Sequence, residues 1–490
     1  MSDPVDIPGV RPPPRRAALP KAIVAAALAT LTVILLAIVG VRYGVLLPQT
    51  RLLIEAAADG LKVGRFGRLK IEGLSGDIWR NVTVAKLVVS DEGGPWLEAD
   101  NLHMTWAYIA LLRREFHAGR IEIQTLKVLR RPTLTPKGED TGLPLSFHID
   151  RAHARVEMAP QFSYERGLYD LALNLAIERN GDQRGSVRAA SVLHPGDHLN
   201  LDYDVAKARP LKVQIDGEEA QGGALAGAMG LPSRQPFVVR GAASGKISEG
   251  QFTAAASSGV ARVLKAQGAW TRDGGVARGV VQLTASALTA RYADRFGPSA
   301  SFVLAGRRAG PDLFALDGRI GSENLSARIQ GLGDVGQRRI GPQGLALNVQ
   351  TAALSRITGG PDLGAARLAG RVTQVSGAKP AWRFAGQAGL SKAEAGGYGL
   401  TQVAGPVEVV EANGQWDVKT RLAGAGGHGT GYLAAMLGAA PGASLDGAKL
   451  ADGRLLLRSL QVTGAGLKVE ATGGRSLFGG LTFKGAAAIS

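Results

Sequence analysis

The feature of this chain that most constrains its fold is a two-residue alternation of apolar and polar side chains, repeated in short runs. The runs 169–177, 199–205 and 211–215 each place leucine, isoleucine, valine or tyrosine at every second position. Successive side chains of a β-strand point to opposite faces, so this period predicts strands with one apolar and one wet face. Turn residues such as Asn180-Gly181-Asp182 separate the runs. The pattern therefore predicts an antiparallel meander.

The same alternation continues toward the end of the chain, where helical periodicity is nearly absent. Glycine accounts for 68 of 490 residues, roughly twice average usage, and suits the many turns. Short helices are predicted at 106–113, 224–229 and 432–437. A long sheet must cover its apolar face by packing on a second sheet, closing into a barrel, or curling into a trough. The expected fold class is mainly β: an elongated, curled antiparallel sheet with a few short helices, and a second packed sheet is the alternative.

An uncharged segment near the N-terminus predicts a transmembrane helix. No charged residue occurs from Ala22 to Val41, and a helix of about 20 residues spans a hydrocarbon core of roughly 30 Å. The basic residues before it are Arg11, Arg15, Arg16 and Lys21. The positive-inside rule then places residues 1–21 in the cytoplasm and the rest across the membrane. A cleaved signal peptide is the alternative, but no small-x-small site follows closely.

The sequence offers no constellation of residues for catalysis. Cysteine is absent, which excludes disulfides, iron–sulfur clusters and thiolate zinc sites. His194 and His198 are separated by Pro195-Gly196, so no helix aligns them as metal ligands. We therefore expect no enzymatic activity and no catalytic, cofactor-binding or metal-ligating residues. The net charge of +16 suits anionic lipid headgroups better than nucleic acid in a membrane-anchored chain.

One stretch, LKIEGLSGDIW from Leu69 to Trp79, suggests a structural feature without chemistry. Two glycines surround Leu74-Ser75, which predicts a tight turn that lets the first hairpin reverse close to the membrane. Aromatic residues after the turn are expected to line an entrance to the sheet. The predicted entrance residues are Gly73, Gly76, Ile78, Trp79, Trp96 and Trp106.

The segment from Leu69 to Pro132 resembles the N-terminal part of the TamB family of inner-membrane translocation and assembly module subunits. The similar elements, in order, are the Gly-Leu-Ser-Gly stretch with Trp79, a strand at 82–90, the sequence DEGGPWL at 91–97, a Leu-rich helix at 106–113, and VLRRP at 128–132. The resemblance implies a β-trough that crosses a Gram-negative periplasm from a single-pass inner-membrane anchor. It also implies an AsmA-like role in passing phospholipid between membranes and an Omp85-type, TamA-like outer-membrane barrel as partner.

The resemblance and the residues together divide the chain into expected modules. Members of the family are usually longer and carry a C-terminal domain that meets the barrel, so a fragment or truncated form is expected. The expected modules are a cytoplasmic tail (1–21), a membrane anchor (22–47), an N-terminal TamB-like module (51–140), a first trough module (141–232), a second (233–441) and further strands (442–490).

Two functions are expected from these features. The first is passive phospholipid transport, in which acyl chains slide along an apolar wall. The second is a scaffold for inserting autotransporters and outer-membrane proteins, in which sheet edges template incoming strands. The predicted wall residues are Leu171, Leu173, Leu175, Ile177, Leu199, Leu201, Tyr203, Leu211, Val213 and Ile215.

Overall fold

The computed structural model describes residues 48–63, 65–134, 145–232, 234–334, 339–359, 362–375 and 381–489. Within them, 26 strands form one sheet. Its first strands are β1 (Leu61–Lys62), β2 (Arg68–Asp77), β3 (Asn81–Asp91), β4 (Gly94–Trp106), β5 (Glu115–Val128), β6 (Ser146–Met158), β7 (Gly167–Ile177), β8 (Gln183–Ser191), β9 (His198–Val205) and β10 (Leu211–Glu219).

The sheet continues without a break to the last described residues. The middle strands are β11 (Phe237–Lys246), β12 (Glu249–Ser258), β13 (Ala261–Thr271), β14 (Gly274–Gln282), β15 (Ser299–Arg308), β16 (Leu313–Ser322), β17 (Ser326–Asp334) and β18 (Arg339–Thr351). The last strands are β20 (Ala366–Val375), β21 (Ala381–Leu390), β24 (Gln402–Ala412), β25 (Gln415–Ala425), β27 (Gly442–Lys449), β28 (Leu455–Thr463), β29 (Leu467–Arg475) and β30 (Leu481–Ile489).

Short helices and a small second sheet accompany the large sheet. The small sheet contains β19 (Asp362–Leu363), β22 (Ala393–Ala395), β23 (Tyr398–Leu400) and β26 (His428–Gly429). The helices are α2 (Pro48–Ala58), the 3₁₀ helices η1 (Tyr108–Arg113) and η2 (Leu283–Ala285), α3 (Pro160–Ser163), α4 (Ala224–Ala228), α5 (Ala287–Phe296), α6 (Leu354–Thr358) and α7 (Tyr432–Leu437).

Each strand of the large sheet pairs with the strand that follows it in that sheet. These described pairings are antiparallel, except that β5 and β6 run parallel. A parallel pair needs a long connection, and residues 129–145 separate these two strands in the sequence. The sheet remains open, since β1 and β30 are not paired with each other. The predicted antiparallel meander is therefore confirmed, with one parallel join that the alternation did not reveal.

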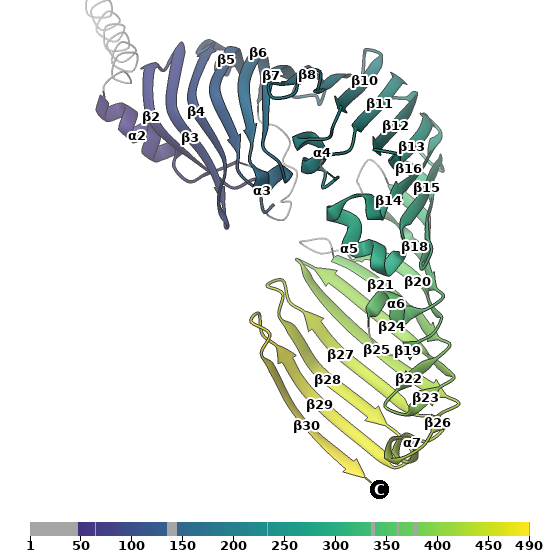
Figure 1. Ribbon diagram of the computed structural model, residues 1–490. Coiled ribbons are helices and arrows are strands. Elements are labelled where there is room, and N and C mark those ends of the chain that lie inside the picture. Colours follow the sequence, from purple (N-terminus) through teal and green to yellow (C-terminus); the bar gives the residue numbers. More distant parts are fainter. Residues whose placement is uncertain are drawn as a thin grey trace, which may run out of the picture.

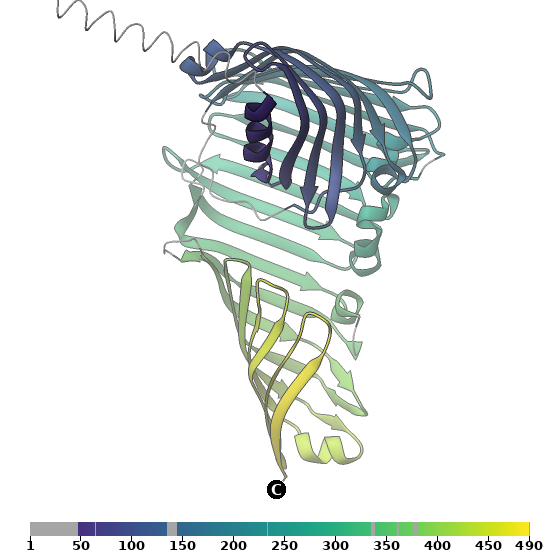
Figure 2. The ribbon, with the colours of Figure 1, turned by 90° about the vertical axis from the view of Figure 1, so that its left-hand side faces the viewer.

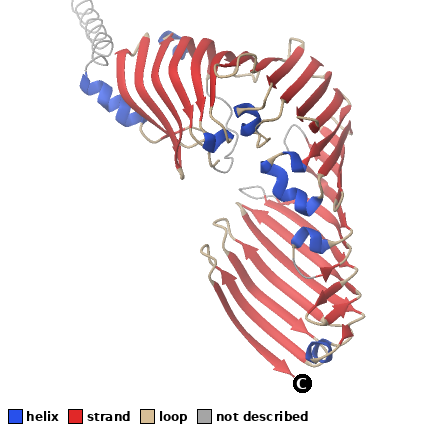
Figure 3. Cartoon of the chain, in the orientation of Figure 1, coloured by secondary structure: helices blue, strands red, loops and turns tan. Residues whose placement is uncertain are grey.

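The sheet bends along its length (Figure 1), and helices α3 to α6 lie on the inner side of the bend. Figure 2 shows the strands running crosswise, with helices gathered along one long side. We call this side the helix rim and the opposite side, where β2 turns into β3 and β4 ends, the open rim. Figure 3 shows how few helices accompany the strands. The mainly β fold with few helices is confirmed.

The helix predictions were partly right. Helix α7 has the predicted bounds, α4 ends one residue before the predicted end, and the third helix is the shorter η1. Helices α2, α3, α5 and α6 and the 3₁₀ helix η2 were missed. None of the helices in the described ranges is long and apolar enough to cross a membrane. The predicted membrane segment, 22–47, and the tail, 1–21, lie outside those ranges.

The predicted module limits fall at recognisable places, although the sheet crosses each of them. The limit at 140 lies in the connection between the parallel strands β5 and β6. The limits at 232 and 441 directly follow the segments that contain α4 and α7. Strand pairing nevertheless runs from β10 to β11 and from β25 to β27. The modules stay a prediction, because a continuous sheet does not define where one ends.

Candidate functional site

The predicted wall residues lie on one face of the sheet. Leu173 of β7 is opposite Val187 of β8, which is opposite Leu201 of β9, which is opposite Ile215 of β10. The neighbouring row runs from Leu175 through Gly185 and Tyr203 to Val213. Because side chains alternate between faces, the remaining wall residues Leu171, Ile177, Leu199 and Leu211 share that face. All ten are half-buried.

The apolar face extends to the first strands through paired apolar positions, although several of these pairings also contain a register shift. One row crosses β2 to β7 through Leu74, Val84, Leu102, Ile123, Ala154 and Leu171. The parallel join between β5 and β6 does not interrupt this row, because the pairing keeps Ile123 opposite Ala154. The apolar stripe therefore begins at the first long strand.

In the middle of the sheet the same face is built largely from small residues. From Ile215 the row continues through Gly241, Ala254, Ala266, Gly279, Phe302, Ile320, Ala327, Val349 and Leu368. Small residues leave room beside the larger ones: a Cβ at Gly279 would lie 2.7 Å from the Phe302 ring. Much of the glycine and alanine in the composition thus serves the apolar face as well as the turns.

The last strands complete the stripe. A parallel row runs through Leu347, Gly370, Gly386, Val407, Thr420, Leu445, Leu460, Ala471 and Gly485. Thr420 is the single polar side chain in this row. The pairings thus connect one apolar face from β2 to β30.

The apolar face is the inner face of the bend. Tyr169 and Phe237 belong to it, and they pack against Ala224 and Ala226 of helix α4. Since the helices lie inside the bend (Figure 1), the face that carries them is concave. Leu304 and Ile320 on this face are each 50 % exposed. A second sheet packed on the wall would bury them, so the second-sheet alternative does not describe this part of the protein.

The opposite, convex face carries charged side chains across β8 to β11. Asp216 on β10 pairs with His198 of β9 at 3.0 Å and with Arg240 of β11 at 3.3 Å. The hydrogen bond from His198 and the nearby Arg240 hold the pKa of Asp216 below its usual range. These groups are partly exposed, so the convex face is in contact with solvent at these strands.

The predicted turn at Gly73–Gly76 is wrong. Both glycines lie inside β2, and the chain reverses at residues 78–80 instead. Each glycine has a positive φ and approaches β3 closely: a Cβ at Gly76 would lie 2.3 Å from the Asn81 carbonyl oxygen, and one at Gly73 2.6 Å from the Ala85 Cβ. The glycines therefore permit close strand pairing rather than the reversal itself.

The structure brings some of the predicted entrance residues together and separates another. Trp106 Nε1 donates a hydrogen bond to the Ile78 carbonyl oxygen at 2.8 Å, and the Trp79 ring lies edge-on to Tyr108 at 5.3 Å. These residues lie together on the open rim. Trp96 lies ten residues before Trp106 on the extended strand β4, roughly 33 Å away on the helix rim. Its Nε1 donates to the Phe66 carbonyl oxygen.

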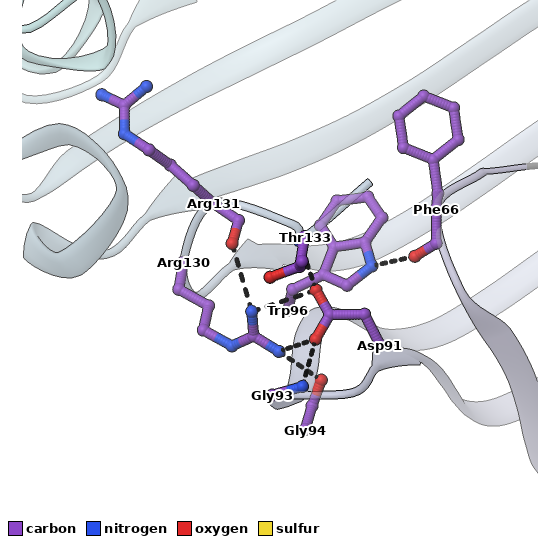
Figure 4. Close-up of polar contacts among 8 residues, drawn as sticks. All are labelled: Phe66, Asp91, Gly93, Gly94, Trp96, Arg130, Arg131 and Thr133. Carbon is purple, nitrogen blue, oxygen red and sulfur yellow. Dashed lines mark hydrogen bonds and ion pairs between the residues drawn. The ribbon is translucent and has the colours of Figure 1, made fainter. Parts of the chain in front are cut away.

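A polar cluster missed by the sequence analysis fixes the helix rim of the first strands (Figure 4). The Asp91 carboxylate accepts hydrogen bonds from Arg130 Nη1 at 3.1 Å, from the Thr133 amide at 2.6 Å and from the Gly93 amide at 2.7 Å. Its side chain is only 3 % exposed. The Arg130 guanidinium and these amides hold the pKa of Asp91 well below its usual range.

The next arginine connects this cluster to a helix far along the chain. Arg131 Nη2 donates to the Ala228 carbonyl oxygen at 2.7 Å, at the end of α4, and its guanidinium lies 5.5 Å from the centre of the Phe162 ring. A Cβ at Gly227 would lie 1.7 Å from the Ser163 carbonyl oxygen, so α3 and α4 touch closely. Arg130 and Arg131 therefore hold parts of the fold together, a role that the sequence analysis did not predict.

Helix α4 is held on the concave face by a buried carboxylate. Glu219 is fully buried, and its two oxygens accept hydrogen bonds from the amides of Leu225 and Ala226 and from the Tyr169 hydroxyl. Burial and the bond to Glu219 raise the pKa of Tyr169 far above its usual value. Two adjacent glutamates usually indicate an exposed turn. Glu219 is instead buried and anchors the helix rim, whereas its neighbour Glu218 is exposed.

No family of proteins, no curated protein and no solved structure matches this chain. Within the described ranges, no group of three or more histidine, aspartate or glutamate side chains could hold a metal ion. The candidate functional site is therefore the concave apolar face itself, bounded by the helix rim on one side and accessible along the open rim.

Proposed function

We propose that the protein is a β-trough that carries phospholipid acyl chains along its concave face, anchored in an inner membrane as in the TamB type. The observation that supports this function best is the apolar face, which the strand pairings connect from β2 to β30. With strands about 4.8 Å apart, that path is on the order of 100 Å long. A path of this length suits movement between two surfaces better than storage of one ligand.

Continuity of the apolar face matters energetically. Burying one methylene group is worth about 0.8 kcal/mol, so a sixteen-carbon chain gains on the order of 12 kcal/mol from an apolar wall. A gap that exposed five methylene groups would oppose passage by roughly 4 kcal/mol. The rows of leucine, valine, alanine and glycine leave no such gap, while the open rim lets charged headgroups remain in water.

Occupancy of the face can be tested with a photo-crosslinking amino acid at Leu201, on the concave face. Its neighbour Asn200 lies on the convex face of the same strand and serves as the matched control. We expect phospholipid adducts, identified by mass spectrometry, at position 201 and none above background at 200. Equal labelling at both positions, or none at either, would argue against a lipid-filled face.

A scaffold for outer-membrane protein insertion is the second proposed function, and one observation favours it. All residues of β30 are exposed, and Phe483 is 64 % exposed on a strand whose outer edge has no described partner. Such an edge can pair with an incoming strand. Prolines along β30 would then impair assembly of a TamA-like barrel and its clients, whereas charges on the concave face would have little effect.

A further inference from the structure

Exposed aliphatic side chains from two separate elements gather at the open rim of the first strands. In η1, Leu112 is 86 % exposed and Ile109 is 57 % exposed. In α2, Leu52 is 64 % exposed and Leu53 is 69 % exposed. A single exposed leucine needs no explanation, but four such side chains at one end of a sheet call for one.

Two contacts place the start of α2 and η1 at this same end of the first strands. Arg51 Nη2 in the first turns of α2 donates to the Gly76 carbonyl oxygen at 2.9 Å, near the end of β2. The turn that follows β2 carries Trp79, which lies against Tyr108 of η1 at 5.3 Å. The start of α2, the turn between β2 and β3, and η1 therefore lie side by side.

The orientation of α2 turns its leucines away from the sheet. Arg51 contacts Gly76, and Glu55, one helical turn later, accepts a hydrogen bond from the Leu74 amide at 2.5 Å. Residues four apart share a helix face, so this face is directed at β2. Leu52 and Leu53 lie off that face, in agreement with their exposure.

Basic and aromatic residues accompany the aliphatic ones. Arg113 and Arg114 directly follow Leu112, and neither guanidinium has an ion pair within the described part of the chain. Apolar side chains beside unpaired cations are typical of segments that bind the interface of an anionic bilayer. Trp79 and Tyr108 add amphipathic aromatic rings, which favour the membrane–water interface.

The direction of the chain also places a bilayer at this end. Helix α2 begins beside the end of β2, so the preceding sequence, with its uncharged run 22–41, joins the fold here. We propose that Leu52, Leu53, Ile109, Leu112, Arg113 and Arg114, which we call the interface patch, insert into the headgroup region of an anionic phospholipid bilayer. This inference rests on the proposed membrane anchor, and it places the first strands of the concave face against the lipid supply.

The chain has no cysteine, so single cysteines can report the depth of chosen positions. The full chain is reconstituted in phosphatidylethanolamine–phosphatidylglycerol vesicles, with an environment-sensitive fluorophore on Leu112→Cys or Leu53→Cys. Leu193→Cys, an exposed leucine on the helix rim side of β8, is the matched control. We expect blue-shifted emission at 112 and 53 and at least threefold stronger quenching by headgroup-proximal spin-labelled lipid than at 193.

The same vesicles test the contribution of the two arginines. They also test whether another part of the chain, rather than lipid, covers the interface patch. Arg113→Gln with Arg114→Gln should reduce quenching at position 53 in anionic vesicles and change it little in purely zwitterionic ones. Quenching at 112 and 53 no stronger than at 193 would overturn the proposal. A blue shift without quenching would overturn it too, since another part of the chain would then cover the patch. Crosslinking of lipid at position 201 is independent of these results. The proposed lipid transport and the proposed membrane insertion of the interface patch can therefore be refuted separately.

Discussion

Arg130 Nη1 lies 3.1 Å from Asp91 Oδ2, although 39 residues separate the two in the sequence. The ion pair ties the hairpin between β3 and β4 to the chain that leaves β5, and Arg131 extends the connection to α4. Strands β3, β4 and β5 and helix α4 are thus held together at one point of the helix rim. In the sequence this point corresponds to two separate motifs, 91–97 and 128–132.

Replacing Asp91 by asparagine should loosen this rim. The amides of Thr133 and Gly93 lose a charged acceptor, and Arg130 is left without its counter-ion. We expect faster hydrogen exchange in β3, β4 and β5 and unchanged exchange beyond β11. Glu92→Gln, an exposed neighbour, is the control and should leave all exchange rates unchanged. Faster exchange spread evenly over the whole sheet would contradict a local role.

The same pair predicts a sensitivity to acid. The folded pKa of Asp91 is depressed, so its stabilising effect is present above the unfolded value of about 3.9 and is lost as the pH falls through the folded pKa. Protection of β3 and β4 should therefore decline below about pH 4 in the natural protein. In Asp91→Asn the decline over that range should be smaller. An identical acid profile in both proteins would count against the ion pair.

The stability of the parallel pair β5 and β6 should depend on pH in the opposite direction. Burial lowers the pKa of His148, but hydrogen bonds to Glu178 at 2.9 Å and Glu115 at 2.7 Å outweigh it, so the pKa is raised. The added stability is full below the unfolded value of about 6.5 and is lost as the pH rises through the folded pKa. His117 and Asp150 lie beside this group.

Hydrogen exchange of β6, corrected for intrinsic rates, should therefore be slower at pH 6 than at pH 8. His148→Gln keeps a hydrogen-bonding side chain without the charge and should remove most of the difference. His103→Gln, within β4 where the ring contacts Thr83 of β3, should preserve it. The expectation fails if His148→Gln shows the full natural difference.

Glu219→Gln should destabilise the attachment of α4 to the concave face. An amide has one acceptor oxygen, so one of the bonds to Leu225, Ala226 and Tyr169 is lost in a buried place. Leaving one buried donor unsatisfied costs about 1–3 kcal/mol. Hydrogen exchange at 224–228 and at the start of β11 reports the loss. The exposed neighbour Glu218→Gln should behave as the natural protein, and equal effects of both changes would refute the anchoring role.

Gly76→Ala should be more harmful than Gly181→Ala. Both glycines have a positive φ, which costs an alanine about 1–2 kcal/mol. Only at Gly76 would the added Cβ also approach a backbone oxygen, at 2.3 Å, since nothing lies within 4 Å at Gly181. The urea midpoint followed by tryptophan fluorescence should fall further for Gly76→Ala. Equal shifts would show that backbone conformation alone accounts for the effect.

The strands were largely predictable and their arrangement was not. The alternation at 169–177, 199–205 and 211–215 identified β7, β9 and β10 and the face their leucines share, because side-chain period follows directly from strand geometry. Helix α5 could have been predicted from its sequence. Leu288, Tyr292 and Phe296 are spaced by four. Ser286 precedes them, and its hydroxyl oxygen accepts a hydrogen bond from the Leu288 amide.

The contacts that shape the site join residues far apart in sequence. Nothing local distinguishes Glu219, fully buried beside Tyr169, from its exposed neighbour Glu218. The glycines at 73 and 76 suggested a turn because positive φ is commonest there, but the same freedom also serves a tight strand pair. The bend of the sheet and the placement of helices on one rim depend on the sum of many such contacts.

The central claim is that lipid passes along one uninterrupted concave face. The most direct measurement places a photo-crosslinking residue at Leu368, far along that face, and compares Leu201→Asp with Asn200→Asp in cells. The account predicts that Leu201→Asp reduces phospholipid adducts at 368 at least tenfold, while adducts before β9 persist and Asn200→Asp has no effect. Undiminished adducts at 368 in a folded Leu201→Asp protein would contradict it.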